Sequence, residues 1–241
     1  MKSRRLPETD IANVAFQPVS QKERVLAQWI KPKTITRSYE PFRQTAGDAV
    51  NQQLPLFPTP QIPTPWEKLE SLVETKCKGN FELLEMNLCI ARSTHNFAVE
   101  NKLTAEPISY RPITLSQGQM YDFSLPLLLR YDGGASVVFT DLRRTGRLSN
   151  HGCHVTHSVQ HQRFRVNFPD LAALRLDVWR YKNDQSRTIE VIRHNDRDLI
   201  PYDDLVRDFS ETYRILNALL EEQSHSRRRS GDGDFGPLFG T

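Results

Sequence analysis

The segment ALRLDVWRY, residues 173–181, sets the architecture of this chain, because its aliphatic residues largely alternate with polar or aromatic ones. A period of two is typical of a β-strand with one face buried and one face in water. A polar turn occupies residues 182–187, and the alternation resumes at 188–194 in TIEVIRH. Together these segments predict a β-hairpin.

Two further elements extend this hairpin into a fold. Upstream, the apolar residues 120–131 and the β-branched residues 135–142 are separated by Asp-Gly-Gly, which predicts a second hairpin because glycine reaches positive φ without a steric clash. Downstream, residues 201–222 begin with Pro-Tyr-Asp-Asp and carry apolar residues at helical spacing. We therefore predict an α+β fold, an antiparallel β-rich domain with a packed C-terminal helix.

Proline density sets the expected domain limits. Nine of the 15 prolines precede Trp66, and such a density disfavours a packed fold. We therefore expect residues 1–65 to be a largely disordered, proline-rich region, residues 66–223 to form a single α+β domain, and residues 224–241 to be a disordered tail.

Three segments have local patterns of their own. Residues 20–30, SQKERVLAQWI, predict a short amphipathic helix that either docks on the main domain or binds a partner. Docking is favoured, because so short a helix is marginal when isolated in water. Residues 66–73 predict a helix, and residues 81–90, FELLEMNLCI, are assigned to a strand although their periodicity also fits a helix.

Composition excludes several classes of protein. Residues 66–223 carry 20 basic and 22 acidic residues, which argues against a broad, strongly basic nucleic-acid-binding face. Three cysteines at unrelated spacings and the absence of a signal-peptide pattern predict a reducing, cytoplasmic location. No apolar run approaches the roughly 20 residues that cross a bilayer, so we expect no membrane association.

Residues 53–57 carry the most specific motif. Gln53-Leu54-Pro55-Leu56-Phe57 resembles the bacterial sliding-clamp-binding peptide, the Q-L-x-L-F pattern of polymerases, repair factors and some plasmid replication initiators. The resemblance implies that Gln53 hydrogen-bonds at the rim of the clamp pocket and that Leu56 and Phe57 fill its apolar subsites. Proline replaces the serine or aspartate more common at the middle position. The alternative is a linker whose Leu56 and Phe57 pack on the main domain.

A local excess of positive charge lies within residues 130–165, which hold six arginines and four histidines but only two acids. From it we predict contacts to DNA or RNA. The expected contact residues are Arg143, Arg144, Arg147, Arg163 and Arg165. His154, His157 and His161 would line one side of a helix and offer a zinc site, but the β-branched residues among them favour a polar strand or loop surface.

A second, weaker resemblance concerns catalysis. Pro169-Asp170 followed by Glu190 is similar to the PD-(D/E)xK nuclease pattern, in which Asp170 and Glu190 would hold Mg²⁺. The lysine position of that pattern is Ile192, and Lys182 and Arg193 are examples of residues that could serve as a migrated base. No phosphate-binding glycine loop, nucleophile elbow or paired Cys-x-x-Cys is present, so an enzyme of familiar type is not expected, nor is a cofactor other than Mg²⁺ for the nuclease.

The sequence thus predicts a noncatalytic accessory protein of DNA metabolism, acting in replication, repair or mobile-element maintenance, that binds nucleic acid and the sliding clamp. The alternatives are a divergent metal-dependent nuclease and a structural subunit of a nucleoprotein or defence complex.

Overall fold

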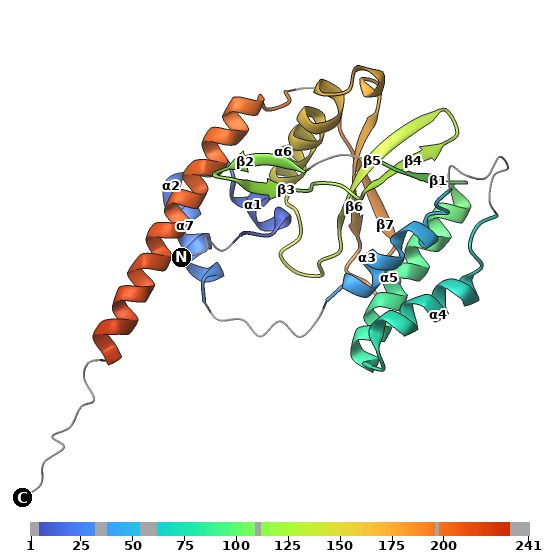
Figure 1. Cartoon of the computed structure of the whole chain (residues 1–241), viewed down its shortest axis with the longest axis horizontal. Coiled ribbons are helices and arrows are strands. Elements are labelled where there is room, and N and C mark those ends of the chain that lie inside the picture. The colour runs from blue at the N-terminus through green and yellow to red at the C-terminus, as the bar shows by residue number, and fades with distance from the viewer. Residues whose placement is uncertain (1–4, 32–37, 54–61, 109–111, 196–197, 232–241) are drawn as a thin grey trace, which may run out of the picture.

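A five-stranded mixed sheet organises the chain (Figure 1). The computed structural model describes residues 5–31, 38–53, 62–108, 112–195 and 198–231. The strand order is β1-β4-β5-β6-β7, and every neighbouring pair is antiparallel except β5 and β6. The strands are β1 (Thr104–Pro107), β4 (Leu127–Tyr131), β5 (Gly134–Asp141), β6 (Arg175–Tyr181) and β7 (Ile189–Arg193). The predicted α+β fold with a mostly antiparallel sheet is confirmed.

Both predicted hairpins are present, as β4–β5 and β6–β7. Gly133 takes a φ of +86° in the first turn, as the Asp-Gly-Gly sequence predicts. The first strand is shorter than expected, because it begins after Pro126, which lacks the N–H that a ladder needs. The residues before it belong to a separate two-stranded hairpin, β2 (Ile113–Ser116) with β3 (Gln119–Tyr121).

The parallel β5–β6 pair requires a crossover, and a helix supplies it. The crossover consists of α6 (Asn150–Gln160), the π-helix η1 (His161–Val166) and the 3₁₀ turn η2 (Pro169–Leu171). The expectation of a polar strand or loop here was wrong. Ser149 caps α6 by accepting a hydrogen bond from the Gly152 N–H, and Val155 and Val159 are at most 1% exposed, so burial overrides their strand preference.

One face of the sheet is covered by α3 (Glu40–Ala49), α4 (Trp66–Cys77) and α5 (Phe81–Glu100), which share a core with the strands (Figure 1). The strand assigned to residues 81–90 was wrong, because they form the first half of α5. The Asn80 side chain accepts a hydrogen bond from the Leu83 N–H and so caps this helix.

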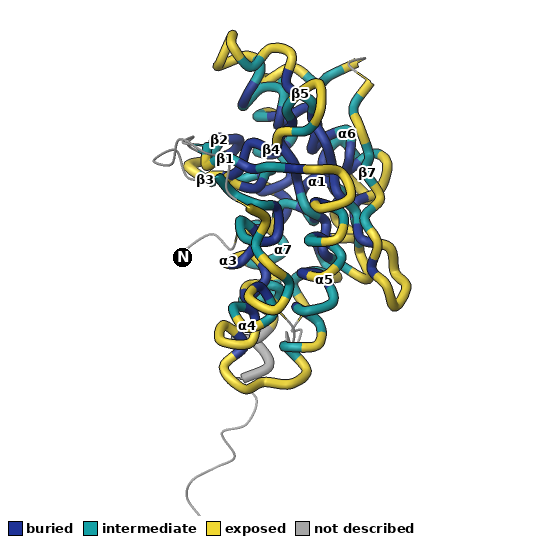
Figure 2. The backbone as a smooth tube through the Cα atoms, turned by 90° about the vertical axis from the view of Figure 1, so that its right-hand side faces the viewer, coloured by how far each residue is buried: buried dark blue, intermediate teal, exposed yellow. Residues whose placement is uncertain are grey.

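The opposite face packs against α6 and α1 (Glu8–Val14), and outside them lie α2 (Val19–Trp29) and α7 (Tyr202–Gly231). The C-terminal helix is confirmed, but it extends past residue 223 to Gly231, into the tail that was expected to be disordered. Figure 2 shows the buried backbone concentrated in the sheet and in the helices against it.

The N-terminal region departs most from expectation, because α1, α2 and α3 all lie within residues expected to be largely disordered. Their prolines begin helices instead of preventing them. Pro7 and Pro18 are the N-caps of α1 and α2, and Pro41 lies in the first turn of α3. Proline is tolerated there because the first N–H groups of a helix have no intrahelical partner.

Long-range contacts join the two ends of the described chain. The Leu6 N–H donates to the Tyr213 hydroxyl on α7 at 2.7 Å. Lys22 on α2 is fully buried, and its Nζ donates to Asp208 and Glu211 on α7, both at 2.8 Å. The docked position predicted for residues 20–30 is therefore confirmed.

Two negative findings concern the part of the chain that the structure describes. No helix there has the length and apolar character needed to cross a membrane. All three cysteines are free thiols, and Cys77 and Cys153 are buried.

Candidate functional site

The clamp-like motif begins where the chain lies along an edge of the sheet. The Gln53 N–H donates to the Ala105 carbonyl at 2.6 Å, and the Ala105 N–H donates to the Asn51 carbonyl at 3.1 Å. Gln52 forms a parallel bridge with Ala105. Residues 51–53 therefore cover the exposed edge of β1 and fix the start of the motif. Leu54, Leu56 and Phe57 lie outside the described residues.

The Gln53 side chain, which the resemblance assigns to the rim of the clamp pocket, has partners within the protein. Its Nε2 donates to the Asn51 carbonyl at 3.1 Å and to Asn51 Oδ1 at 3.0 Å. Asn51 adopts a φ of +55°, a left-handed conformation that asparagine tolerates better than most residues. A tight turn at Asn51 thus brings its side chain back onto Gln53.

The other end of the motif segment is held by α5. His95 Nε2 donates to the Thr64 carbonyl at 2.9 Å, and the His95 ring packs edge-on against Trp66 with centroids 5.9 Å apart. A cavity of about 290 Å³ lies at this corner, between α5 and the start of β1. Its walls include Asn51 and Pro63, one from each end of the segment.

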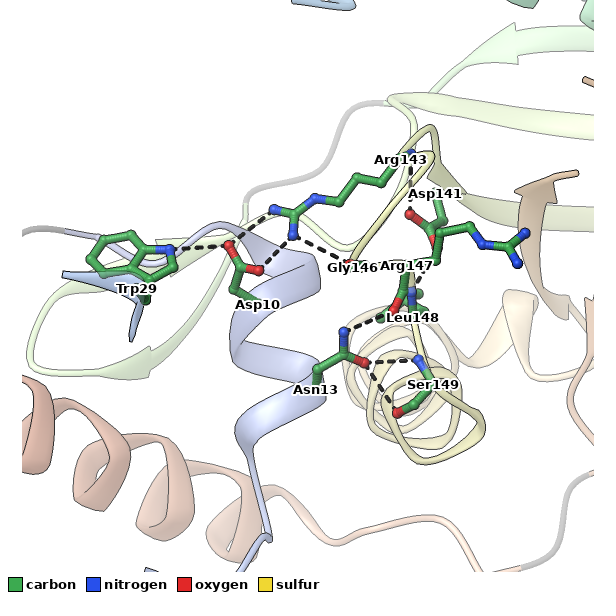
Figure 3. A network of polar contacts seen from close by, with 9 residues as sticks. All are labelled: Asp10, Asn13, Trp29, Asp141, Arg143, Gly146, Arg147, Leu148 and Ser149. Atoms are coloured by element: carbon green, nitrogen blue, oxygen red, sulfur yellow. Dashed lines mark hydrogen bonds and ion pairs between the residues drawn. The ribbon is translucent and has the colours of Figure 1, made fainter. Parts of the chain in front are cut away.

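The five arginines predicted to contact nucleic acid are separated by the fold, and most of them make internal contacts. Arg143 forms two bonds to the Asp10 carboxylate, at 2.5 and 3.0 Å, and Asp10 also accepts from Trp29 Nε1 (Figure 3). Arg147 donates to the Tyr181 carbonyl at 3.3 Å. Of the three arginines in this loop, Arg143 and Arg147 are half-buried and Arg144 is exposed.

The loop that carries these arginines is organised from beneath by Asp141, which is fully buried. Its carboxylate accepts from the Leu148 N–H at 2.7 Å, and burial raises its pKa. Asn13 of α1 reaches the same loop, donating to the Arg147 carbonyl and accepting from Ser149 (Figure 3). These contacts give the arginine-rich loop a structural role in holding α1 against α6.

The other two arginines lie on η1. Arg165 Nε donates to the Leu174 carbonyl at 2.7 Å, and the Arg163 guanidinium lies 5.8 Å from the centre of the Phe168 ring. Arg165 therefore helps to hold the crossover against the start of β6, and Arg163 packs within the crossover itself.

The histidines of α6 lie against β7. His157 is 3% exposed, and its Nε2 donates to the Ile192 carbonyl at 3.2 Å. The His194 ring lies 5.2 Å from the ring of His157 and 6.3 Å from that of His154. Burial lowers the pKa of His157 to about 4 and also lowers that of His154. Within the described residues no group of three or more histidine, cysteine or acidic side chains is placed to hold a metal ion, so His154, His157 and His161 do not form a zinc site there.

The carboxylates of the nuclease pattern lie in different settings. Asp170 lies in η2, whereas Glu190 lies on β7 opposite Arg180 of β6, with which it forms an ion pair at 3.9 Å. Position 192, where the pattern has its lysine, is the isoleucine whose carbonyl accepts a hydrogen bond from His157. This arrangement supplies no observation in favour of metal-dependent cleavage.

Sequence reasoning missed the residues that anchor the motif, namely Asn51, His95 and Ala105. They lie far from one another along the chain, and their contact depends on β1 being an edge strand, for which the sequence has no local signal. The left-handed turn at Asn51 was the one feature with a readable cue, because asparagine favours that conformation.

Comparison with known proteins agrees with the motif. The family described as "Sliding clamp-binding bacterial toxin SocB" matches residues 9–226. The chain is 26% identical over 235 residues to the "DNA replication inhibitor toxin SocB" of Caulobacter vibrioides (strain NA1000 / CB15N), and the alignment covers 97% of each protein. No solved structure shows significant similarity.

Proposed function

Because the chain belongs to the family of sliding-clamp-binding bacterial toxins, we propose that it inhibits DNA replication by binding the sliding clamp through residues 53–57. The observation that supports this most directly is the Gln-Leu-Pro-Leu-Phe motif, which lies within the matched region. The structure adds that the motif starts at a sheet edge and is rejoined to the fold at α5.

Inhibition follows from competition between this protein and other clamp-binding proteins for one pocket of the clamp. Polymerases and repair factors use the same type of peptide, so a protein that fills the apolar subsites with Leu56 and Phe57 excludes them from that clamp subunit. The prolines beside these residues favour an extended backbone and so reduce the conformational entropy lost on binding. The folded body then adds bulk beside the occupied pocket.

The proposal includes no catalytic step and no nucleic-acid contact. Arg143, Arg147 and Arg165 are used inside the protein, and no contact among the described residues favours DNA or RNA as a partner. Those contacts and the nuclease activity stay predictions from the sequence.

The direct test compares clamp binding by the full-length protein and by the double variant Leu56→Ala/Phe57→Ala, measured by calorimetry. We expect the double variant to lose at least roughly 30-fold in affinity, as when about 2 kcal/mol of hot-spot contact is removed. The matched control is Val166→Ala/Phe168→Ala, which shortens two apolar residues that are 57% and 38% exposed on the crossover. Equal binding by both double variants would exclude residues 53–57 as the clamp-binding segment.

A second readout tests the mechanism. The full-length protein should displace a fluorescent Q-L-x-L-F peptide from the clamp, and the Leu56→Ala/Phe57→Ala variant should not. Clamp binding without displacement would show that the protein binds the clamp at a surface other than the peptide pocket.

A further inference from the structure

The two edges of the five-stranded sheet differ in how they are covered. Residues 51–53 cover the edge at β1 through backbone bonds to Ala105. The outer side of β7, at the other edge, is not paired with any strand or chain segment within the described residues. An open edge is a template for pairing with another chain, and proteins block such edges with prolines, bulges or very short strands. The five residues of β7 include no proline and no bulge, so β7 is open to another strand.

Two hydrogen bonds define which backbone groups of β7 face outward. The Lys182 N–H donates to the Thr188 carbonyl at 2.9 Å, and the His194 N–H donates to the Leu176 carbonyl at 3.2 Å. Bonded positions recur at every second residue of an antiparallel pair, so residues 188, 190, 192 and 194 are directed at β6. The outward groups are the N–H and C=O of Ile189, Val191 and Arg193. Within the described chain none of these groups has a hydrogen-bond partner.

We propose that β7 pairs antiparallel with β7 of a second copy, so that two molecules form one continuous sheet. A twofold axis through Val191 places this residue opposite itself, and it places Ile189 opposite Arg193 of the second copy. All three outward positions are then bonded positions, and every outward N–H and C=O of both copies gains a partner. The edge is complementary to itself because these positions are spaced evenly about Val191.

The side chains of β7 also fit a second copy. Val191 meets Val191 on the face that packs against α5, and pairs of β-branched residues stabilise antiparallel strands. Glu190 and Arg193 are both exposed and have opposite charges. Two copies of this edge therefore bring no net charge into the interface.

The helix beside this edge, α5, runs in the same direction as β7. The Cys89 and Ser93 side chains donate to the Gln185 and Arg187 carbonyls, in that order. Further along the helix, Phe97 borders the same cavity as Val191. Phe97 therefore marks the level of the proposed twofold axis on α5.

The charges on α5 are arranged in the same self-complementary way. Arg92 and Glu100 are exposed and line a groove of about 430 Å³ between α5 and the start of β7. Arg92 lies about 7.5 Å before Phe97 along the helix, and Glu100 lies about 4.5 Å after it. An antiparallel second copy therefore brings its Glu100 to within about 3 Å of the level of Arg92. Arg92 also contacts Glu70 and Trp66 of α4, and opposite charges meet at both ends of the interface.

Dimerisation through β7 goes beyond clamp binding and is independent of it, because the β1 edge that anchors Gln53 lies at the opposite side of the sheet. In the dimer β1 is the outermost strand at each end. Each copy therefore keeps its own anchor for the clamp motif.

Molecular mass, measured by light scattering after gel filtration, tests the pairing. The full-length protein should have twice the chain mass of 27.9 kDa. Val191→Lys and Val191→Glu should each have the mass of one chain, because like charges then oppose each other on the axis. An equimolar mixture of the two should regain the double mass, which also shows that both variants are folded. Val25→Lys, at a valine of α2 that is 39% exposed, is the matched control and should stay dimeric.

Three mass results would overturn the proposal. These are a wild-type protein that stays monomeric up to about 100 μM, where a dimer with a micromolar Kd is mostly associated, a dimer that survives both Val191 substitutions, and a mixture that does not regain the double mass. Amide hydrogen exchange gives a test without substitutions. The N–H groups of Ile189, Val191 and Arg193 should be protected in concentrated protein and should exchange faster on dilution. Fast exchange at every concentration would also overturn the pairing.

Discussion

Asn51→Gly should strengthen clamp binding by removing an internal competitor for Gln53. Gln53 Nε2 now donates to Asn51 Oδ1 at 3.0 Å and to the Asn51 carbonyl at 3.1 Å. If the clamp takes the Gln53 amide, these bonds break. Glycine removes the Oδ1 acceptor but keeps the backbone, because Asn51 has a φ of +55° that glycine adopts freely. Alanine would add left-handed strain and confuse the result.

The expected change in clamp affinity corresponds to the loss of one hydrogen bond. A typical intramolecular hydrogen bond contributes about 0.5–1.5 kcal/mol, and since Asn51 and Gln53 are both partly exposed, we take the lower part of that range. A gain of about 0.5–1 kcal/mol corresponds to a Kd roughly 2- to 5-fold lower.

Calorimetric titration of the clamp resolves a change of that size. The control is Lys78→Gly at the end of α4, where φ is +50° and the side chain is exposed, so the backbone change is the same but Gln53 keeps its Asn51 partner. Unchanged or weaker binding by Asn51→Gly would refute the reasoning, because the Asn51–Gln53 contact would then not oppose the clamp. Equal tightening by Lys78→Gly would attribute the gain to chain flexibility.

Three predictions concern the fold that supports the motif. Lys22→Met should lower the free energy of unfolding by about 2–4 kcal/mol in urea, because two carboxylates of α7 lose a buried ammonium group. Stability should fall by up to about 3 kcal/mol as the pH drops from 6.5 towards 4, because the folded state holds the pKa of His157 at about 4. Urea titrations at several pH values should show a smaller pH dependence for His157→Gln. Arg143→Ala should cost about 1–2 kcal/mol through loss of the paired bonds to Asp10, and Arg144→Ala should change the urea midpoint little.

Each of these has a contradicting outcome. A Lys22→Met protein as stable as the wild type would mean that the two carboxylates are adequately solvated. Because the pKa of His157 is lower in the folded protein, the unfolded chain binds the proton more tightly. Stability that increases as the pH falls from 6.5 to 4 would therefore contradict the burial of His157. Equal effects of the two arginine substitutions would remove the distinction between a structural and an exposed arginine.

The sequence predicts the sheet better than its surroundings, for a physical reason. Alternation in residues 173–194 and a glycine turn at 132–134 are local signals for hairpins, and the structure contains both. Residues 150–160 form a helix although their β-branched residues favour strand, because the energy of burial against the sheet exceeds the small intrinsic preference. Proline content misled in the N-terminal region, since composition does not distinguish a proline that starts a helix from one that prevents it.

The candidate site likewise has one part that the sequence predicts and one part that it does not. The motif at 53–57 is local, so five consecutive residues were enough to predict it. Its anchors are not local. Gln53 meets Ala105 only because β1 forms an edge of the sheet, and Thr64 meets His95 only because α5 packs beside that edge. Neither contact leaves a periodic pattern in the sequence.

The contact between Leu6 and Tyr213 has a consequence for biosynthesis. It joins residues 207 positions apart in the chain, so the core that includes α1 and α7 does not close until nearly the whole polypeptide has left the ribosome. The motif at residues 53–57 is translated well before β1 and α5, the elements that anchor it. For that interval the nascent chain carries the motif without the two anchors that later hold Gln53 and Thr64.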